Sequence, residues 1–127
     1  TGYDTTSVVG AKKAAKKIIG FGAGCVVMTM GKDGCLIVLN GEEIVVSAPA
    51  IEKSLVKDTS GAGDCFLGAF SYHLTRDNNG QRKDLLQMKR LIAAAKYACA
   101  AATLSVQKNG TQSSYPDRES VDNFLKQ

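Results

Sequence analysis

Two aspartates flank a run of very small residues in the stretch Lys57–Phe70, KDTSGAGDCFLGAF. Asp58 and Asp64 stand on either side of Gly61–Gly63, and an apolar run follows Asp64 at once. This order predicts a helix that begins at the motif. Helix N-termini carry unpaired N–H groups and the positive end of the macrodipole, and small residues let an anion approach them closely. The motif therefore indicates a phosphate-binding turn.

Asp64 has two explanations at this position. Asp is a preferred N-cap residue, whose side chain accepts a hydrogen bond from the first helical turn. A carboxylate kept charged beside an anion site is also what a general base requires. Residue types and spacing alone leave both explanations open.

The first half of the chain predicts a helix, a buried strand and a hairpin. Apolar residues at helical spacing in Ser7–Phe21 predict an amphipathic helix. The almost unbroken apolar run Cys25–Met30 is typical of a strand covered on both faces, as in a parallel sheet. Asn40-Gly41 separates the β-rich runs Cys35–Leu39 and Glu42–Ala48, which predicts an antiparallel hairpin.

The second half predicts mainly helices. A short extended piece is expected at Ser54–Val56, and helices at Asp64–Arg76, Arg82–Gln107 and Asp117–Lys126. The alanine-rich middle of the long helix permits close packing against a neighbouring helix or a flat ligand. The order of elements predicts an α/β fold with a mostly parallel sheet and one antiparallel hairpin.

Composition excludes several classes of protein. The 127 residues are 44% hydrophobic and 22% charged, and no apolar run reaches the length of a membrane span. The net charge of +4 lacks the aromatic interleaving of a nucleic-acid interface, so neither nucleic acid nor membrane is expected as a partner. The four cysteines are far apart and form no C-x-x-C unit, so a zinc site is not expected. We expect the cysteines to be reduced, as is usual inside cells. We expect a cytoplasmic location, alone or together with a nuclear one.

Three segments carry a resemblance to a known family. DTSGAGDCFLGAF resembles the D-T-x-G-A-G-D signature of the ribokinase-like sugar kinases, also called the phosphofructokinase B family. TMGKDG, at Thr29–Gly34, is similar to the family's T-x-G-x-x-G loop. NGTQSSYP, at Asn109–Pro116, resembles the segment that follows the long C-terminal helix in the ribokinases of this family, rather than in its adenosine kinases or fructokinases.

The resemblance runs over essentially the whole chain and implies its place in a larger protein. Residues 1–127 would be a single domain piece, the C-terminal part of a three-layer α/β/α fold that binds the nucleotide and carries the catalytic base. The sugar-binding half, its lid and an N-x-x-E motif associated with magnesium would precede Thr1, which is not a methionine.

The same resemblance implies roles for individual residues. Asp64 would be the catalytic base, and the backbone N–H groups of Gly61, Ala62 and Gly63 would form an anion hole for the transferred phosphoryl group. Contacts to ATP would come from Thr29, Gly31, Lys32, Asp33, Gly34 and Cys99, the last at a position where relatives often carry His or Asn. An activating potassium site would be formed by Asp58, Ser60, Val106, Asn109, Gly110 and Ser114.

The implied activity is transfer of the γ-phosphate of ATP, bound with Mg²⁺, to the 5-hydroxyl of D-ribose, with K⁺ as activator. Another sugar or nucleoside kinase of the family, or a truncated nucleotide-binding module without catalysis, is the alternative. The full-length protein would be a homodimer formed through its lid, and the isolated chain is expected to be inactive.

Overall fold

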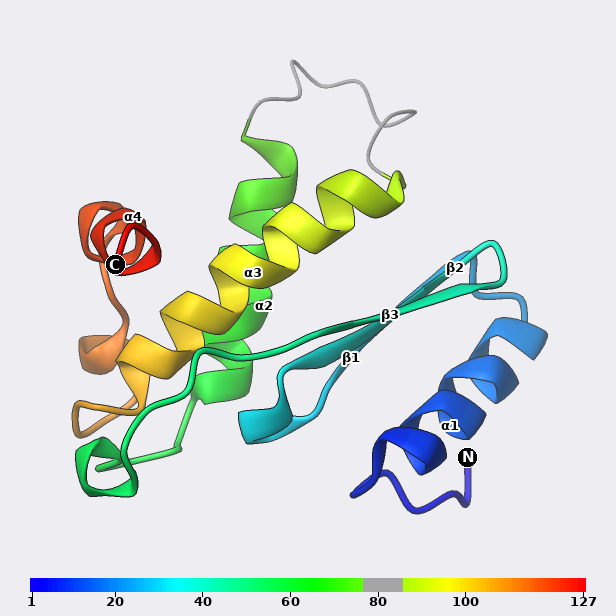
Figure 1. Ribbon diagram of the computed structural model, residues 1–127, viewed down its shortest axis with the longest axis horizontal. Helices are drawn as coiled ribbons and strands as arrows, with labels where there is room; N and C mark the ends of the chain where they lie inside the picture. Colours follow the sequence, from blue (N-terminus) through cyan, green and yellow to red (C-terminus); the bar gives the residue numbers. More distant parts are fainter. Residues whose placement is uncertain (77–85) are drawn as a thin grey trace.

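The computed structural model describes residues 1–76 and 86–127 of the chain. Its centre is a small sheet with helices on both faces (Figure 1). The elements, in chain order, are α1 (Val8–Gly20), β1 (Cys25–Thr29), β2 (Cys35–Leu39), β3 (Glu42–Val46), α2 (Ala62–Thr75), α3 (Met88–Ser105) and α4 (Arg118–Leu125).

The sheet has the strand order β1-β2-β3, and both pairings are antiparallel. The predicted hairpin is confirmed: Asn40 and Gly41 have φ values of 50° and 84°, the left-handed conformation that a tight two-residue turn requires at both positions. Every pairing in the described part of the chain is antiparallel, so the mostly parallel sheet stays a prediction.

Strand β2 is the one covered on both faces. Its residues Cys35, Ile37 and Leu39 pack in a core with α2 and α3, whereas Leu36 and Val38 pack against α1. This alternation creates the three layers α/β/α. The prediction that Cys25–Met30 is fully covered was wrong, because β1 lies at an edge of this sheet and only its Val26 is buried.

Helix α1 agrees closely with the sequence prediction. Ser7 is its N-cap, and the Oγ atom accepts a 3.1 Å hydrogen bond from the Gly10 N–H group. Lys12 and Lys16 reach across to Glu43 on β3, with N–O distances of 3.1 and 3.0 Å. These ion pairs add to the apolar contacts that hold α1 against the sheet.

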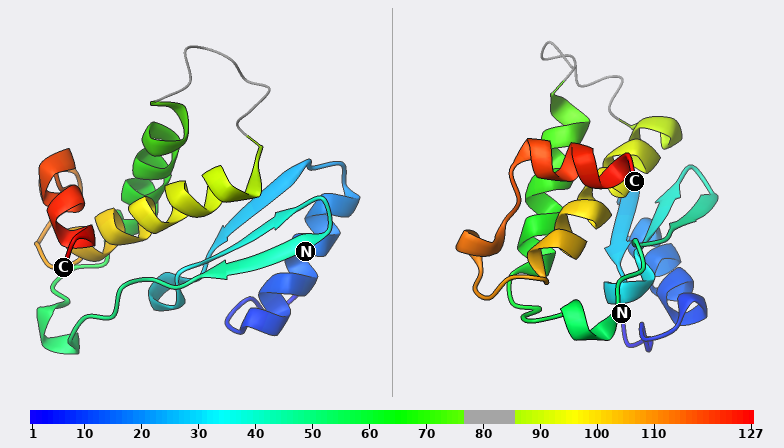
Figure 2. Two further views of the ribbon diagram at one scale, coloured as in Figure 1. Left: turned by 45° about the horizontal axis from the view of Figure 1, so that its top comes forward. Right: turned by 60° about the vertical axis from the view of Figure 1, so that its left-hand side comes forward.

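Helices α2 and α3 pack side by side on the opposite face (Figures 1 and 2). The alanines of α3 allow the close approach that the sequence suggested; Ala94, Ala95 and Ala98 are fully buried. The helix begins at Met88 rather than Arg82, and residues 82–85 of the predicted helix lie outside the described residues.

The predictions for the C-terminal helix and for the segment Ser54–Val56 had different outcomes. Helix α4 forms as expected, with Asp117 as its N-cap accepting a 2.8 Å bond from the Ser120 N–H group. The extended piece predicted at Ser54–Val56 was wrong, because a 3₁₀ turn at Lys53–Leu55 closes through a 3.0 Å bond from the Leu55 N–H group to the Glu52 carbonyl. No helix in the described ranges has the length and apolar character needed to cross a membrane.

Candidate active site

The small-residue motif forms the start of α2, two residues earlier than predicted. Gly61 is the N-cap, and the helix begins at Ala62, so Asp64 is its third residue. The explanation of Asp64 as the N-cap was therefore wrong. In the described part of the chain, the N–H groups of Gly61, Gly63 and Asp64 have no protein acceptor, and that of Ala62 makes only a long 3.3 Å bond to the Thr59 carbonyl. The turn thus presents backbone donors that an anion can use.

The structure explains why the two glycines of the turn differ. Gly61 has a φ value of +76°, and a β-carbon there would lie 2.9 Å from the Tyr115 hydroxyl oxygen and 3.3 Å from Thr111. A β-carbon at Gly63 would meet nothing within 4 Å. Gly61 is needed for the backbone conformation, whereas Gly63 leaves open space beside the N–H groups.

A groove of about 510 Å³ joins this turn to the Thr29–Gly34 loop. Ala62 and Gly63 line one end of the groove. Of the residues predicted to contact ATP, the groove brings together Thr29, Gly31, Lys32, Gly34 and Cys99. Asp33 of the same loop is not part of the lining. Elements far apart in the sequence, β1, α2 and α3, therefore meet at a single groove.

The lining of the groove combines positive charge with apolar surface. Lys32 and Lys53 are the charged residues among its described lining, which contains no carboxylate. Phe66 from α2 and Ala102 from α3 supply apolar surface beside Cys99. Such a lining suits a ligand that combines an aromatic ring with phosphates.

Cys99 contributes little exposed surface to this groove, because its side chain is 3% exposed. Its thiol lies in the same buried cluster as that of Cys35, at the start of β2, and the two thiols interact. The interaction lowers the pKa of Cys99, and together with desolvation it raises the pKa of the fully buried Cys35. The pair joins the floor of the groove to the central strand.

Glycines shape the loop between β1 and β2 in different ways. The Met30 N–H group donates to the Gly34 carbonyl at 2.8 Å, and the Gly34 N–H group donates to the Gly31 carbonyl at 3.1 Å. Both glycines have positive φ, 57° at Gly31 and 93° at Gly34. A β-carbon at Gly31 would meet nothing within 4 Å, whereas one at Gly34 would collide with the backbone at the end of β3.

Asp58 ties the motif to the loop that follows α3. Its Oδ1 atom accepts a 2.8 Å bond from the Ser60 N–H group, and its Oδ2 atom accepts a 3.0 Å bond from the Gly110 N–H group. These bonds, first that from the Ser60 backbone, hold the pKa of Asp58 below its usual value. The Val106 carbonyl accepts bonds from the Lys57 and Asp58 N–H groups at 2.8 and 3.2 Å. A charged carboxylate is thus held by two backbone N–H groups, one on each side of the contact between the motif and the loop after α3.

The structure places the other residues of the predicted cation site in the same loop. Asn109 and Gly110 directly follow α3 and its C-terminal turn. Ser114 is 1% exposed, and its Oγ atom donates a 2.6 Å bond to the Thr111 carbonyl. Carboxylate and carbonyl oxygens are hard ligands, so the chemistry of this set fits a hard cation such as K⁺. The two bonds already made by the Val106 carbonyl make it the least available of these oxygens.

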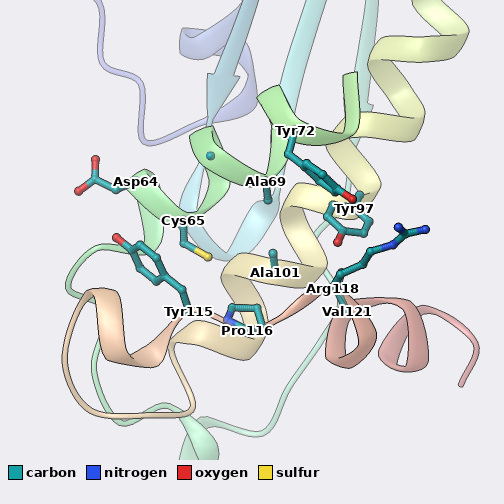
Figure 3. Close-up of a pocket in the computed structure, with 11 residues that line it drawn as sticks. Asp64, Cys65, Ala69, Tyr72, Tyr97, Ala101, Tyr115, Pro116, Arg118 and Val121 are labelled. Atoms are coloured by element: carbon teal, nitrogen blue, oxygen red, sulfur yellow. The ribbon is translucent and has the colours of Figure 1, made fainter. Parts of the chain in front are cut away.

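A second pocket of about 430 Å³ lies between α2, α3 and the segment before α4 (Figure 3). Tyr72, Tyr97, Tyr115 and Arg118 are among its lining residues, and Asp64 stands at its margin. In Figure 3 the Asp64 carboxylate points away from the other lining residues. The side chain of Asp64 is therefore directed outward from the start of α2 (Figure 3).

Comparison with known proteins decides the family. Residues 1–118 match the pfkB family of carbohydrate kinases. The chain belongs to the pfkB family. A ribokinase of Mus musculus is 35% identical over 121 residues, which are 95% of this chain and 34% of that protein. A deoxyribokinase of Salmonella typhi is 33% identical over 125 residues, 98% of this chain and 36% of that protein.

A solved structure shows the same fold. Arabidopsis thaliana ribokinase complexed with ribose and ATP superposes with a TM-score of 0.78 at 33% identity, over 99% of this chain and 36% of that one. Its ribokinase-like α/β fold is therefore shared by this pfkB chain. The chain spans about a third of the length of the curated relatives that it matches.

Several groove residues of this pfkB chain were missed by sequence reasoning. Ala102 and Thr103 line the groove with Cys99, and their spacing of three and four residues places them on the same face of α3. That spacing could have identified them once Cys99 was chosen. Thr59 lies inside the D-T-S-G-A-G-D motif, and its place there could have identified it. No sequence pattern marked Lys53 as a groove residue, because it reaches the groove only through the folding of its loop.

Proposed function

We propose that this chain is the nucleotide-binding and catalytic part of an ATP-dependent sugar kinase. The observation that carries the proposal is the groove that joins the Thr29–Gly34 loop to the start of α2. It offers apolar surface for the adenine ring, two lysines for the phosphates, and the Gly63 N–H group, which has no acceptor among the described residues. Phosphoryl transfer depends mainly on positioning and charge stabilisation, which is what these groups provide.

In this proposal each group at the start of α2 has a separate task. The N–H groups of Gly61, Ala62 and Gly63 stabilise charge on the phosphoryl group as it moves, acting as an oxyanion hole. Asp64 accepts the proton of the attacking sugar hydroxyl. Lys32 and Lys53, which line the same groove, hold the remaining phosphates. Mg²⁺ bound with ATP would neutralise phosphate charge, and the resemblance places the motif associated with it outside this chain.

We assign K⁺ to the oxygen atoms around Asp58, at the carbonyls of the loop after α3. The charged Asp58 and its two backbone bonds support the assignment. A cation there would fix the loop that leads into the anion hole, because Asp58 lies three residues before Gly61.

The acceptor we propose is D-ribose at its 5-hydroxyl. Support comes from the similarity to the Mus musculus ribokinase and to the Arabidopsis thaliana ribokinase complexed with ribose and ATP. Deoxyribose is the second candidate, because the Salmonella typhi deoxyribokinase is almost as similar. The homodimer, the cytoplasmic location and the inactivity of the isolated chain stay predictions.

The test is a sugar screen with full-length protein. Phosphorylation of ribose, deoxyribose and fructose is measured with ATP and Mg²⁺, in potassium and in sodium buffer. We expect ribose to be preferred and potassium to stimulate turnover. Replacing Asp64 by Asn should lower kcat by about 10²–10⁴-fold and leave ATP affinity within about twofold, because only proton transfer is lost.

The matched control is Asp122→Asn, the same change on α4. It should leave turnover unchanged, since Asp122 pairs with Arg118 across one helical turn. Full activity in the Asp64→Asn variant would refute the role of Asp64 as base. Absence of ATP-dependent phosphorylation of any sugar by the full-length protein would refute the proposed function.

A further inference from the structure

The hydroxyl of Tyr115 reaches the backbone of the motif from a distant part of the sequence. It donates a hydrogen bond to the Gly61 carbonyl at 3.2 Å, across a separation of 54 residues. The same carbonyl accepts the Cys65 N–H group at 2.8 Å, as the first bond of α2. The Gly61 carbonyl oxygen is therefore held by two donors from different parts of the chain.

A held carbonyl also fixes the direction of an N–H group. The Gly61 carbonyl and the Ala62 N–H group belong to one planar peptide unit, in which a trans bond makes them point in opposite directions. Apart from the two bonds to the Gly61 carbonyl, this peptide unit is restrained by the long 3.3 Å bond from the Ala62 N–H group to the Thr59 carbonyl. We propose that Tyr115 is a positioning residue for phosphoryl transfer, whose hydroxyl aligns the Ala62 N–H group of the anion hole. This inference rests on the proposed function.

The surroundings of Tyr115 keep its hydroxyl in place. Pro116 follows it, and a 3₁₀ turn at Gln112–Ser114 precedes it, closed by a 3.2 Å bond from the Tyr115 N–H group to the Gln112 carbonyl. Figure 3 shows its ring along the margin of the second pocket, with the hydroxyl end beside the start of α2. Thr111 packs on Gly61 from the same loop. The C-terminal loop thus closes over the turn as one unit.

The chemistry of the hydroxyl suits a permanent donor. Desolvation raises the pKa of Tyr115, and the charge of Asp64 raises it further. The phenol therefore stays protonated at neutral pH and continues to donate its hydrogen bond. Without the Tyr115 hydroxyl, the Gly61 carbonyl still accepts the hydrogen bond from the Cys65 N–H group, so the start of α2 can form. Loss of the hydroxyl should consequently affect the reaction more than the fold.

The experiment removes only this hydroxyl, with Tyr115→Phe in full-length protein. Tyr72→Phe is the matched control, since Tyr72 lines the same pocket and its hydroxyl makes no hydrogen bond within the described residues. Removing a direct oxyanion donor costs about 10²–10³-fold in kcat, and misaligning one should cost less, about tenfold. We expect that loss in Tyr115→Phe with KM for ATP within about twofold, and no change in the control.

A second readout does not depend on turnover. ADP with aluminium fluoride mimics the transferring phosphoryl group, so its affinity reports the alignment of the anion hole. Tyr115→Phe should bind ADP alone like the wild type and bind ADP with aluminium fluoride about tenfold more weakly. The thermal midpoint should stay close to that of Tyr72→Phe.

Three results would overturn the inference. Kinetics and binding equal to those of Tyr72→Phe would show that the hydroxyl positions nothing. A fall in thermal midpoint together with equal weakening of ADP and of its fluoride complex would show a structural role instead. A wild-type protein that neither binds ADP nor phosphorylates a sugar would overturn the proposed function itself, and the inference with it.

Discussion

Gly34 offers the sharpest test of how the Thr29–Gly34 loop is built. The residue has φ and ψ values of 93° and −127°, a region that side chains strongly disfavour. A β-carbon there would lie 2.6 Å from the Ala48 nitrogen and 2.9 Å from the Ser47 carbonyl carbon, and would also overlap the Val46 carbonyl oxygen. All three atoms belong to the backbone, so no side-chain rotation can relieve the collision. Gly34→Ala should therefore push the loop away from the end of β3.

The magnitude follows from two separate costs. The disfavoured backbone conformation costs about 1–3 kcal/mol for a residue with a side chain. Overpacking against rigid neighbours adds about 1–3 kcal/mol. Gly34→Ala should thus lower the free energy of unfolding by about 2–6 kcal/mol, a large part of the total for a typical domain. Gly31→Ala is the matched control, because its β-carbon would meet open space and only the conformational cost of about 1–2 kcal/mol applies.

The assay is urea unfolding of the full-length protein, followed by far-UV circular dichroism. The midpoint of Gly34→Ala should fall well below that of Gly31→Ala, and the slope of the transition should be the same for both. Equal midpoints for the two variants would refute the reasoning, because the backbone collision would then have no consequence. A larger loss in Gly31→Ala would refute it as well.

Two further predictions concern the groove and the loop after α3. Ala102→Trp should fill the groove and lower ATP affinity at least about tenfold, whereas Ala93→Trp, on the exposed side of α3, should leave it unchanged in calorimetric titration. Equal ATP affinities in the two variants would contradict the proposed location of the nucleotide. Asp58 stabilises the fold while it is charged, and its pKa in the folded protein lies below the ordinary 3.8. Its contribution to the free energy of unfolding is therefore fully present above pH 3.8 and is lost as the pH falls through the lower pKa of the folded protein. The stability difference between wild type and Asp58→Asn should therefore shrink below pH 3.8 in urea titrations, and a difference that grows there would contradict the role of Asp58.

The sequence by itself determined the features that depend on neighbouring residues. The amphipathic helix at Ser7–Phe21, the Asn40-Gly41 turn and the helix after the glycine motif all follow from short-range patterns, and the structure contains each of them. The phosphate-binding role of Gly61–Gly63 is a prediction of the same local kind, because helix N-termini attract anions wherever they occur. Family membership was visible for the same reason, since its motifs are contiguous segments.

Only the tertiary structure decided which residues from distant segments meet. Whether a strand is central or lies at an edge depends on pairing, which local composition does not specify, and so β2 rather than β1 is the covered strand. Lys53 enters the groove from the loop before α2, and Tyr115 reaches the Gly61 carbonyl from the loop after α3, because these loops pack against α2 and α3 in one particular way. Gly34 was predicted as a phosphate contact, and the structure adds a backbone requirement that exists only once β3 lies behind it. Contacts of this kind depend on packing between elements, which no single window of the sequence contains.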